Sequence, residues 1–253
     1  MTGATGGAAR VDGVLFDVDD TLVDTQAAFA HALSAVADRY LPHLPAERHG
    51  DVLATWRADV GGHYRAYTRG ELGYLEQRML RANALHEEFG GAVLDEVGYA
   101  EWNRLFEEGF ARSWSAHPDA AAVVERCVAA GLAVGALTNA SVAYQTTKLA
   151  RAGFEQVPVL VGVDTLGVGK PDPRVFTEAC RRLGTAPERT AYVGDELDID
   201  AHAAVRAGLL GVWIDRPGGR RVEVPAADVA AARDAGVEVV ASLAELPAVL
   251  GIA

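Results

Sequence analysis

The sequence predicts an α/β fold in which a parallel sheet lies between two layers of helices, with an all-helical domain inserted near the start of the chain. Two observations predict it. Short apolar runs that end abruptly at polar residues alternate with segments of helical periodicity, and the stretch from residue 26 to residue 113 shows helical periodicity without any strand pattern. Such apolar runs are typical of buried parallel strands, and their alternation with helices is typical of βαβ units.

The elements follow in order along the chain. The first apolar run, residues 14–16, ends in acids and predicts a buried strand that leads into a polar loop. The later predicted strands are residues 132–137, 157–163, 191–193 and 211–214. The predicted helices between them are residues 118–130, 141–152, 173–183 and 199–207. Five strands and their helices therefore make up the expected three-layer core.

The inserted segment reads as consecutive amphipathic helices. They are expected at about residues 27–40, 51–68, 71–89 and 99–114, with Pro42 and Pro45 breaking the first. Because the insertion follows the first strand's loop directly, we expect a helical lid over the ligand crevice, the alternative being a helical domain remote from it. The expected domains are a flexible tail at 1–10, a core of 11–25 and 114–253, and a helical cap of 26–113.

Composition limits the classes of function. The chain has 253 residues and a formal net charge of −12, so it offers no basic surface for nucleic acid. The first ten residues lack the apolar stretch of a signal peptide, and no run approaches ~20 apolar residues, so we expect a soluble, cytoplasmic protein. Cys127 and Cys180 are too few for a disulfide framework or a thiolate metal site and are expected to be packing residues.

Polar residues follow several predicted strands. In a parallel sheet the ligand crevice lies beyond the carboxyl ends of the strands, so Asp17, Thr138 and Asp195 are expected to be neighbours. A carboxylate can attack phosphorus when nearby negative charge is neutralised, and Mg²⁺ held by Asp17 and Asp195 would neutralise it. Asp19, two residues further on, is placed to protonate a leaving group and then to deprotonate water.

The pair of acids alone leaves other interpretations open, namely a solvated turn or a calcium loop. The calcium loop fails because Leu22 stands where it needs a glycine and Ala28 where it needs its closing glutamate. Thr138 and Asn139 offer a hydroxyl and an amide at the end of the second strand, where they would bind phosphate or only cap a helix.

Only two of the 23 basic residues are lysines, Lys148 and Lys170. Lys170 suggests a need for a compact ammonium that reaches both a phosphate oxygen and the nucleophilic carboxylate. The glycines before it suggest a P-loop, but Asp164 and Pro171 replace residues that this motif requires. Lys148 falls within a predicted helix, and we assign it to a solvated face. Asp198 is expected to be structural, at a helix start.

Together these motifs resemble the haloacid dehalogenase-like superfamily, in the branch with a helical cap inserted after the first motif. The resemblance spans about residues 12–215 and rests on four motifs in family order: Asp17-Val18-Asp19-Asp20-Thr21, Thr138, Lys170-Pro171-Asp172-Pro173, and Gly194-Asp195 with Asp200. Glu196 departs from the small hydroxyl residue often found after the fourth-motif aspartate.

The resemblance implies a Rossmann-like core and a Mg²⁺-dependent phosphatase that acts on a small phosphorylated metabolite, of the phosphoglycolate, sugar phosphate or nucleoside monophosphate type. It implies Asp17 as nucleophile, Asp19 as acid and base, and Thr138 and Lys170 as phosphate clamps. The metal would be held by Asp17, the Asp19 main-chain carbonyl and Asp195, and Asp200 would be auxiliary.

Other activities within the resemblance are weighed too. Haloacid dehalogenases lack the second aspartate of the first motif, which Asp19 supplies here, and phosphonoacetaldehyde hydrolase needs a cap lysine that this cap lacks. A phosphomutase using the same intermediate stays open, as does a non-catalytic binding protein on this fold. Candidate substrate contacts in the cap are His63, Tyr64, Arg65, Tyr67, Arg78 and Arg81, near a Gly61-Gly62 hinge, each with packing or solvation as the alternative role.

Overall fold

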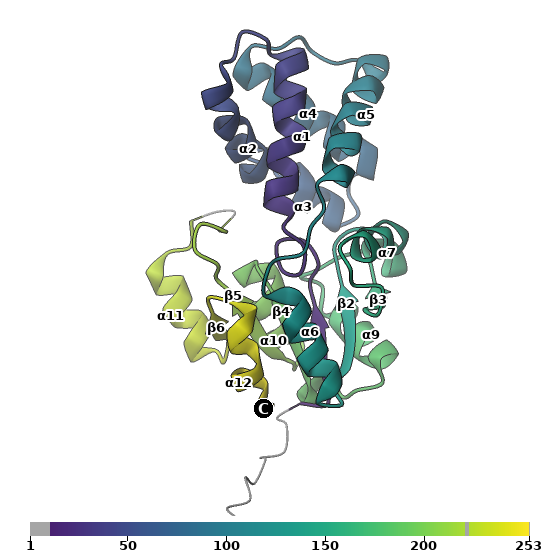
Figure 1. Ribbon diagram of the computed structural model, residues 1–253, viewed down its shortest axis with the longest axis vertical. Coiled ribbons are helices and arrows are strands. Elements are labelled where there is room, and N and C mark those ends of the chain that lie inside the picture. The colour runs from purple at the N-terminus through teal and green to yellow at the C-terminus, as the bar shows by residue number, and fades with distance from the viewer. Residues whose placement is uncertain (1–10, 221–222, 253) are drawn as a thin grey trace, which may run out of the picture. The chain divides into compact units, whose positions relative to one another are not determined.

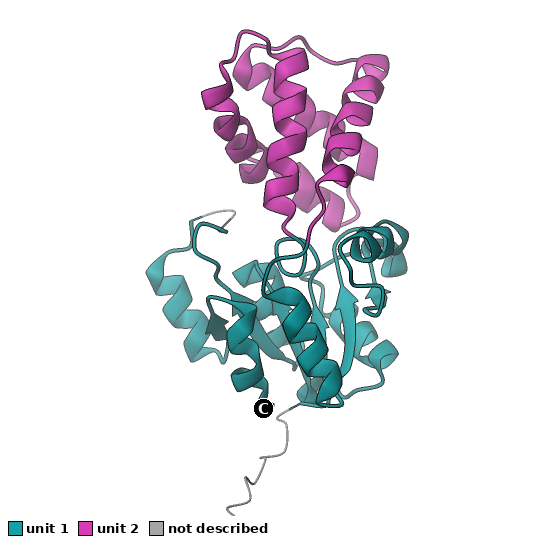
Figure 2. Cartoon of the chain, in the orientation of Figure 1, with its two compact units in different colours: residues 1–23, 116–253 teal, residues 24–115 magenta. Residues whose placement is uncertain are grey.

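The computed structural model describes residues 11–220 and 223–252, so the predicted flexible tail at residues 1–10 lies outside the described residues. The described chain divides into two compact units. One combines the segment that ends at Val23 with the segment that begins at Ala116, and the other is Asp24–Ser115 (Figure 2). We call them the sheet unit and the helical unit.

The sheet unit is built on one six-stranded parallel sheet in the order β3-β2-β1-β4-β5-β6 (Figure 1). Its strands are β1 (Gly13–Phe16), β2 (Ala133–Leu137), β3 (Val159–Val161), β4 (Thr190–Gly194), β5 (Leu210–Ile214) and β6 (Glu238–Val240). The predicted α/β class is confirmed. The chain builds β2 and β3 on one side of β1 and then β4 on its other side, so the connections diverge beside β1, where such sheets bind ligands.

Helices accompany the strands as the periodicity predicts. They are α6 (Ala120–Ala129), α7 (Val142–Arg151), α8 (Val163–Leu166), α9 (Pro173–Leu183), α10 (His202–Arg206), α11 (Ala226–Asp234) and α12 (Leu246–Leu250), with 3₁₀ turns at Pro187–Arg189 and Leu243–Glu245. The predicted helix at 199–207 is instead a π-helical turn, Leu197–Ala201, followed by α10. The predicted strand at 157–163 is shorter at both ends, and at its C-terminal end α8 begins directly after Gly162.

The core of the sheet unit lies between the strands and these helices. Leu15, Leu137 and Tyr192 point from three neighbouring strands into one buried cluster with Phe176 of α9 and Ala204 of α10. Figure 1 shows α6 on the opposite side of the sheet from α10. Cys127 and Cys180 are buried and unpaired by disulfide, in agreement with the packing role predicted for them.

The helical unit consists of α1 (Thr25–Tyr40), α2 (His49–Ala58), α3 (His63–Thr68), α4 (Tyr74–Phe89) and α5 (Glu96–Arg112), with a 3₁₀ turn at Ala46–Arg48. The single helix predicted at 51–68 is two helices, because Asp59 (φ 44°) and Gly62 (φ 65°) adopt left-handed conformations between them. Aromatic side chains fill its interior, with Trp102 stacked on Phe106 at a centroid distance of 5.4 Å.

Two of the candidate substrate contacts are used inside the helical unit. Arg78 pairs with Glu107 (Nη2 to Oε1, 3.0 Å). Arg81 donates to the main-chain oxygen of Trp56 at 2.6 Å and lies 3.4 Å from Asp59. Both guanidinium groups are buried and also lie over aromatic rings. Their contacts are those of packing residues, the alternative that the sequence left open for them.

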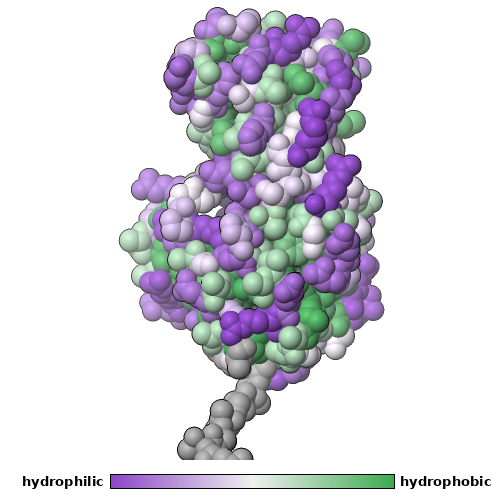
Figure 3. Space-filling view, viewed as in Figure 1, coloured by the Kyte–Doolittle hydropathy of each residue, from purple (hydrophilic) through white to green (hydrophobic). Residues whose placement is uncertain are grey.

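On the face drawn in Figure 3, hydrophilic and hydrophobic residues are interspersed over the surface of each unit, as expected for folded proteins in water. Among the described residues, no helix has both the length and the apolar character needed to cross a membrane.

Candidate active site

Asp17 and Asp19 lie on a tight loop that continues β1. The Asp17 amide still bonds to Val193 of β4 (N to O, 2.8 Å), so the first acid stays in register with the sheet. The chain then turns at Asp20, whose φ of 56° is left-handed, and folds back so that Val23 donates to the Val18 oxygen at 2.9 Å. The turn holds both acids at the carboxyl edge of the sheet.

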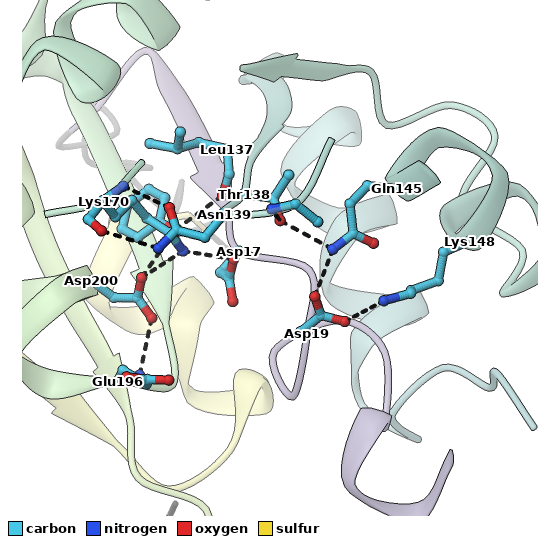
Figure 4. A network of polar contacts seen from close by, with 12 residues as sticks. Asp17, Asp19, Leu137, Thr138, Asn139, Gln145, Lys148, Lys170, Glu196 and Asp200 are labelled. Carbon is cyan, nitrogen blue, oxygen red and sulfur yellow. Dashed lines mark hydrogen bonds and ion pairs between the residues drawn. The ribbon is translucent and has the colours of Figure 1, made fainter. Parts of the chain in front are cut away.

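Lys170 is the buried centre of the site. Its ammonium donates to Asp17 Oδ1, Asp200 Oδ1 and the Tyr192 hydroxyl, each at 2.7 Å (Figure 4). The lysine side chain is only 3% exposed, so these three acceptors replace water around the charge. The Tyr192 hydroxyl in turn donates to the Leu137 main-chain oxygen at 3.1 Å. The segments that follow or form β1 and β4 thus meet at one ammonium group, and β2 is joined to them through Tyr192.

Asn139 fixes the backbone of this lysine. Its Nδ2 donates to the Lys170 main-chain oxygen at 3.0 Å, and its Oδ1 accepts from the Lys170 amide at 2.6 Å. A side chain at Gly169 would collide with the side-chain amide of Asn139. The bond between Lys170 and Pro171 is cis. The Asn139 side chain, expected from sequence to bind phosphate, is therefore bonded at both ends to the lysine loop.

Burial and mutual charge set the protonation of this cluster. Burial raises the pKa of Asp17 to about 8, and the neighbouring Asp200 and Asp19 charges add to this while Lys170 opposes it. Burial would lower the pKa of the Lys170 ammonium, but Asp17 and Asp200 hold that pKa well above its ordinary value. Lys170 therefore stays charged beside a carboxylate that needs positive charge to remain ionised.

Thr138 is buried at the end of β2. Its Oγ1 accepts hydrogen bonds from the Ala140 amide at 3.2 Å and from Gln145 Nε2 at 3.1 Å. A hydroxyl has two acceptor positions and one hydrogen, so with both acceptor positions in use the hydrogen is what Thr138 can offer a ligand. The hydroxyl lies in the same polar network as the acids (Figure 4).

Two side chains of α7 donate hydrogen bonds to the Asp19 carboxylate. Its Oδ2 accepts from Gln145 Nε2 at 2.6 Å and its Oδ1 from Lys148 Nζ at 2.5 Å. The Lys148 side chain is 2% exposed, whereas that of Asp19 is 40% exposed. The assignment of Lys148 to a solvated face was wrong, because its helical position turns it toward the acid and not toward water.

Asp195, at the end of β4, completes an acidic cluster. Asp17, Asp195 and Asp200 each offer one carboxylate oxygen, and these atoms lie within 4.8 Å of one another. Burial, together with the charges of Asp20, Glu196, Asp200 and Asp17, raises the pKa of Asp195 well above its ordinary value. Such a crowded set of hard oxygen donors fits a divalent cation such as Mg²⁺, which would hold the carboxylates in their ionised form.

Asp200 itself is already engaged on both oxygens. Oδ1 accepts from Lys170, and Oδ2 accepts from the Glu196 amide at 3.0 Å. Asp17 and Asp195 are therefore the better candidates for direct metal ligands, and Asp200 is better suited to an auxiliary role. The Asp19 carboxylate faces α7, so a metal contact by Asp19 would use its main-chain carbonyl, as the sequence resemblance implies.

A family model for haloacid dehalogenase-like hydrolases matches residues 11–208, which include every residue of this network. The chain belongs to the haloacid dehalogenase-like hydrolases. This family membership confirms the resemblance inferred from the four motifs.

Several relatives of this haloacid dehalogenase-like hydrolase are phosphatases. It is 33% identical over 211 residues to the N-acetylmuramic acid 6-phosphate phosphatase of Pseudomonas aeruginosa, covering 79% of this chain and 84% of that protein. It is 37% identical over 158 residues to the phosphoserine phosphatase of Thermus thermophilus, covering 60% of this chain and 63% of that protein, less than two thirds of its length. An (S)-2-haloacid dehalogenase of Burkholderia cepacia is 33% identical over 105 residues, 41% of this chain and 45% of that protein.

Solved structures confirm the fold. The HAD-hydrolase YfnB of Bacillus subtilis, bound to magnesium, superposes with a TM-score of 0.75 at 24% identity, covering 96% of this chain and 100% of that one.

Sequence reasoning missed Tyr192, Gln145 and Lys148 in this haloacid dehalogenase-like hydrolase. Tyr192 was counted only as part of an apolar strand, although a tyrosine buried in a sheet needs a partner for its hydroxyl. Gln145 and Lys148 lie three residues apart in a predicted helix, a spacing that puts both on one face. The rarity of lysine in this chain was a signal for Lys148 as much as for Lys170.

Proposed function

We propose that this haloacid dehalogenase-like hydrolase is a Mg²⁺-dependent phosphatase that hydrolyses a small phosphorylated metabolite through an aspartyl-phosphate on Asp17. The observation that carries the proposal is the Asp17 carboxylate, held at one oxygen by a buried ammonium and lying beside the second acid, Asp195. The phosphatases among its relatives support the choice of phosphate esters as substrates.

In the first step a carboxylate oxygen of Asp17 attacks phosphorus, and the bond from phosphorus to the ester oxygen breaks. The Asp19 carboxyl gives its proton to the departing alkoxide, which leaves as an alcohol. The Thr138 hydroxyl would donate to an oxygen of the transferring phosphoryl group. The Lys170 ammonium, whose hydrogen bonds include one to Asp17, would stabilise the negative charge of that group through its own positive charge.

In the second step water attacks the phosphorus of the aspartyl-phosphate and gives a proton to the Asp19 carboxylate. The bond between phosphorus and the Asp17 oxygen breaks, which releases inorganic phosphate and restores both acids. When bound between Asp17 and Asp195, Mg²⁺ would supply the positive charge that keeps the carboxylates ionised and offsets the charge of the phosphate. Asn139 takes the role of fixing the Lys170 backbone rather than binding phosphate through its side chain.

A screen of the purified chain against phosphorylated metabolites tests the proposal. The panel includes phosphoglycolate, phosphoserine, sugar phosphates and nucleoside monophosphates, with phosphate release measured in Mg²⁺ and in chelator. We expect Mg²⁺-dependent release from at least one compound and its loss by ~10³-fold or more in Asp17→Asn. Equal release in chelator, or retained activity in Asp17→Asn, would overturn it.

Two other reactions are tested alongside the screen, with isomeric phosphates and halide as their products. A phosphomutase would convert a sugar 1-phosphate into an isomeric phosphate without releasing inorganic phosphate. A dehalogenase would release halide from 2-haloacids without metal. The presence of Asp19 favours the phosphatase, because haloacid dehalogenases in this family lack the second aspartate of the first motif.

A further inference from the structure

The acid–base residue assigned above is held by two side chains that no motif of the sequence marks. Gln145 and Lys148 come from the same face of α7 and each donates to a different oxygen of Asp19, at 2.6 Å and 2.5 Å (Figure 4). A carboxylate fixed at both oxygens cannot rotate freely about its last side-chain bond. Each oxygen keeps a second lone pair for a proton or a substrate atom.

The side chains of Gln145, Lys148 and Asp19 differ in their exposure to solvent. Gln145 and Lys148 are buried, whereas Asp19 remains 40% exposed at its side chain. The two donors therefore approach Asp19 from the protein side and leave its other side accessible to substrate and water. A surface ion pair would instead expose both partners.

The burial of Gln145 and Lys148 carries a cost that packing alone does not offset. An ammonium removed from water needs compensating contacts, and Lys148 has Asp19 and, at 5.2 Å, the ring of Tyr144. The carbonyl oxygen of Gln145 is buried with no hydrogen-bond partner among the described residues. An apolar side chain would suit either buried position better if structure were the only requirement.

The helix that presents the two residues is fixed at its start. The Val142 amide donates to Asp164 Oδ1 at 3.0 Å. Gly162 passes so close that an added Cβ would lie 2.5 Å from the Ala140 oxygen and 2.8 Å from the Val142 nitrogen. Gln145 also bonds to Thr138 Oγ1, so one amide connects the acid–base residue with the phosphate-binding hydroxyl.

We propose that Gln145 and Lys148 are positioning residues that orient the Asp19 carboxylate for proton transfer to the leaving group. The proposal rests on the phosphatase function above. Both lysines of the chain then serve the first motif, with Lys170 on Asp17 and Lys148 on Asp19. Replacing Gln145 or Lys148 should weaken catalysis most for substrates whose leaving group most needs a proton.

The test compares two substrates of similar shape, p-nitrophenyl phosphate and phenyl phosphate, with Mg²⁺ present. Phenolate is the poorer leaving group and depends more on protonation. In Lys148→Met and in Gln145→Leu we expect kcat/KM for phenyl phosphate to fall ~10-fold or more beyond any fall for p-nitrophenyl phosphate. Thr147→Ala, at an exposed position of α7, is the matched control and should keep the wild-type ratio.

A double variant separates positioning from general damage. If Lys148 acts through Asp19, Lys148→Met should add no more than ~2-fold to the loss already caused by Asp19→Asn. Circular dichroism checks that each variant folds. If Lys148→Met does not fold, Gln145→Leu tests the proposal in its place. Equal losses on both substrates, or full additivity with Asp19→Asn, would overturn the inference.

The two proposals fail in different ways. A wild-type chain that releases phosphate from neither aryl ester nor any metabolite of the screen would contradict the phosphatase function and the inference with it. An active wild-type chain whose variants keep the wild-type ratio of the two substrates would contradict the inference alone.

Discussion

At the scale of single residues, the choice of lysine at position 170 follows from geometry. Its three ammonium hydrogens match three acceptors, Asp17, Asp200 and Tyr192, that approach from different directions. A guanidinium presents its donors in one plane and is bulkier, so it cannot meet the same three oxygens in a pocket where the side chain is 3% exposed.

We therefore expect Lys170→Arg to lower kcat/KM by on the order of 10²-fold although the charge is unchanged. Steady-state kinetics on any substrate identified in the screen measures this. Arg181→Lys, on an exposed part of α9, is the control for a basic-residue exchange and should be neutral. Activity of Lys170→Arg within ~3-fold of wild type would show that charge alone suffices.

At the scale of elements, the turn that leaves β4 is built around Gly194. A side chain there would collide with the carboxylate of Asp200, which sits over the strand end and bonds to the Glu196 amide and Lys170. The π-helical turn Leu197–Ala201 places Asp200 in that position. Trp213 of β5 steadies the same turn by donating to the Asp195 main-chain oxygen at 2.8 Å.

Gly194→Ala should push Asp200 away from Lys170 and lower kcat by ~10- to 100-fold, because small displacements of catalytic groups are costly. The kinetics are compared with Gly50→Ala, a helical glycine of α2 whose added Cβ would meet no atom within 4 Å. A Gly194→Ala variant with wild-type kcat would show that the close contact has no bearing on the site.

At the scale of the whole molecule, a partly buried polar cluster around Asp119 connects distant segments of the sheet unit. Asp119, at the start of α6, accepts from Arg216 at 2.8 and 2.9 Å, from Ser242 at 2.6 Å and from the Leu243 amide at 2.9 Å. Burial alone would raise the pKa of Asp119, but these donors outweigh it and lower that pKa to about 2.

A carboxyl whose pKa is lowered by folding stabilises the native state above its ordinary pKa, and this stabilisation is lost as pH falls through the native value. We expect Asp119→Asn to lower the free energy of unfolding at pH 7 by ~1–2 kcal/mol, a figure reduced for partial solvent screening. The difference from wild type should shrink as pH falls from about 4 toward 2.

Urea unfolding at several pH values measures this difference, with the exposed Asp234→Asn as control. A deficit in Asp119→Asn that is the same at pH 7 and pH 3 would mean that the carboxylate charge is not its cause.

Some features of the fold and of the candidate site were predictable from sequence, and others depend on packing. The parallel sheet was predictable because its apolar runs end in polar residues, whereas β6, three residues long and beginning with Glu238, carries too weak a pattern. The first-motif acids, Thr138 and Asp195 were predictable from their places after strands, and Lys170 from the rarity of lysine in this chain. The role of Lys148 was not, because its partner Asp19 is 129 residues away in sequence and only the packing of α7 brings them together.

The central claim is that Asp17 carries the phosphoryl group during turnover. The most direct measurement quenches the wild-type chain during Mg²⁺-dependent hydrolysis, reduces it with borohydride and reads the modified residue by peptide mass spectrometry. Reduction converts an aspartyl-phosphate to homoserine, so the account predicts homoserine at position 17 that depends on substrate. Phosphate release with unmodified Asp17, or with the label on another residue, would contradict it.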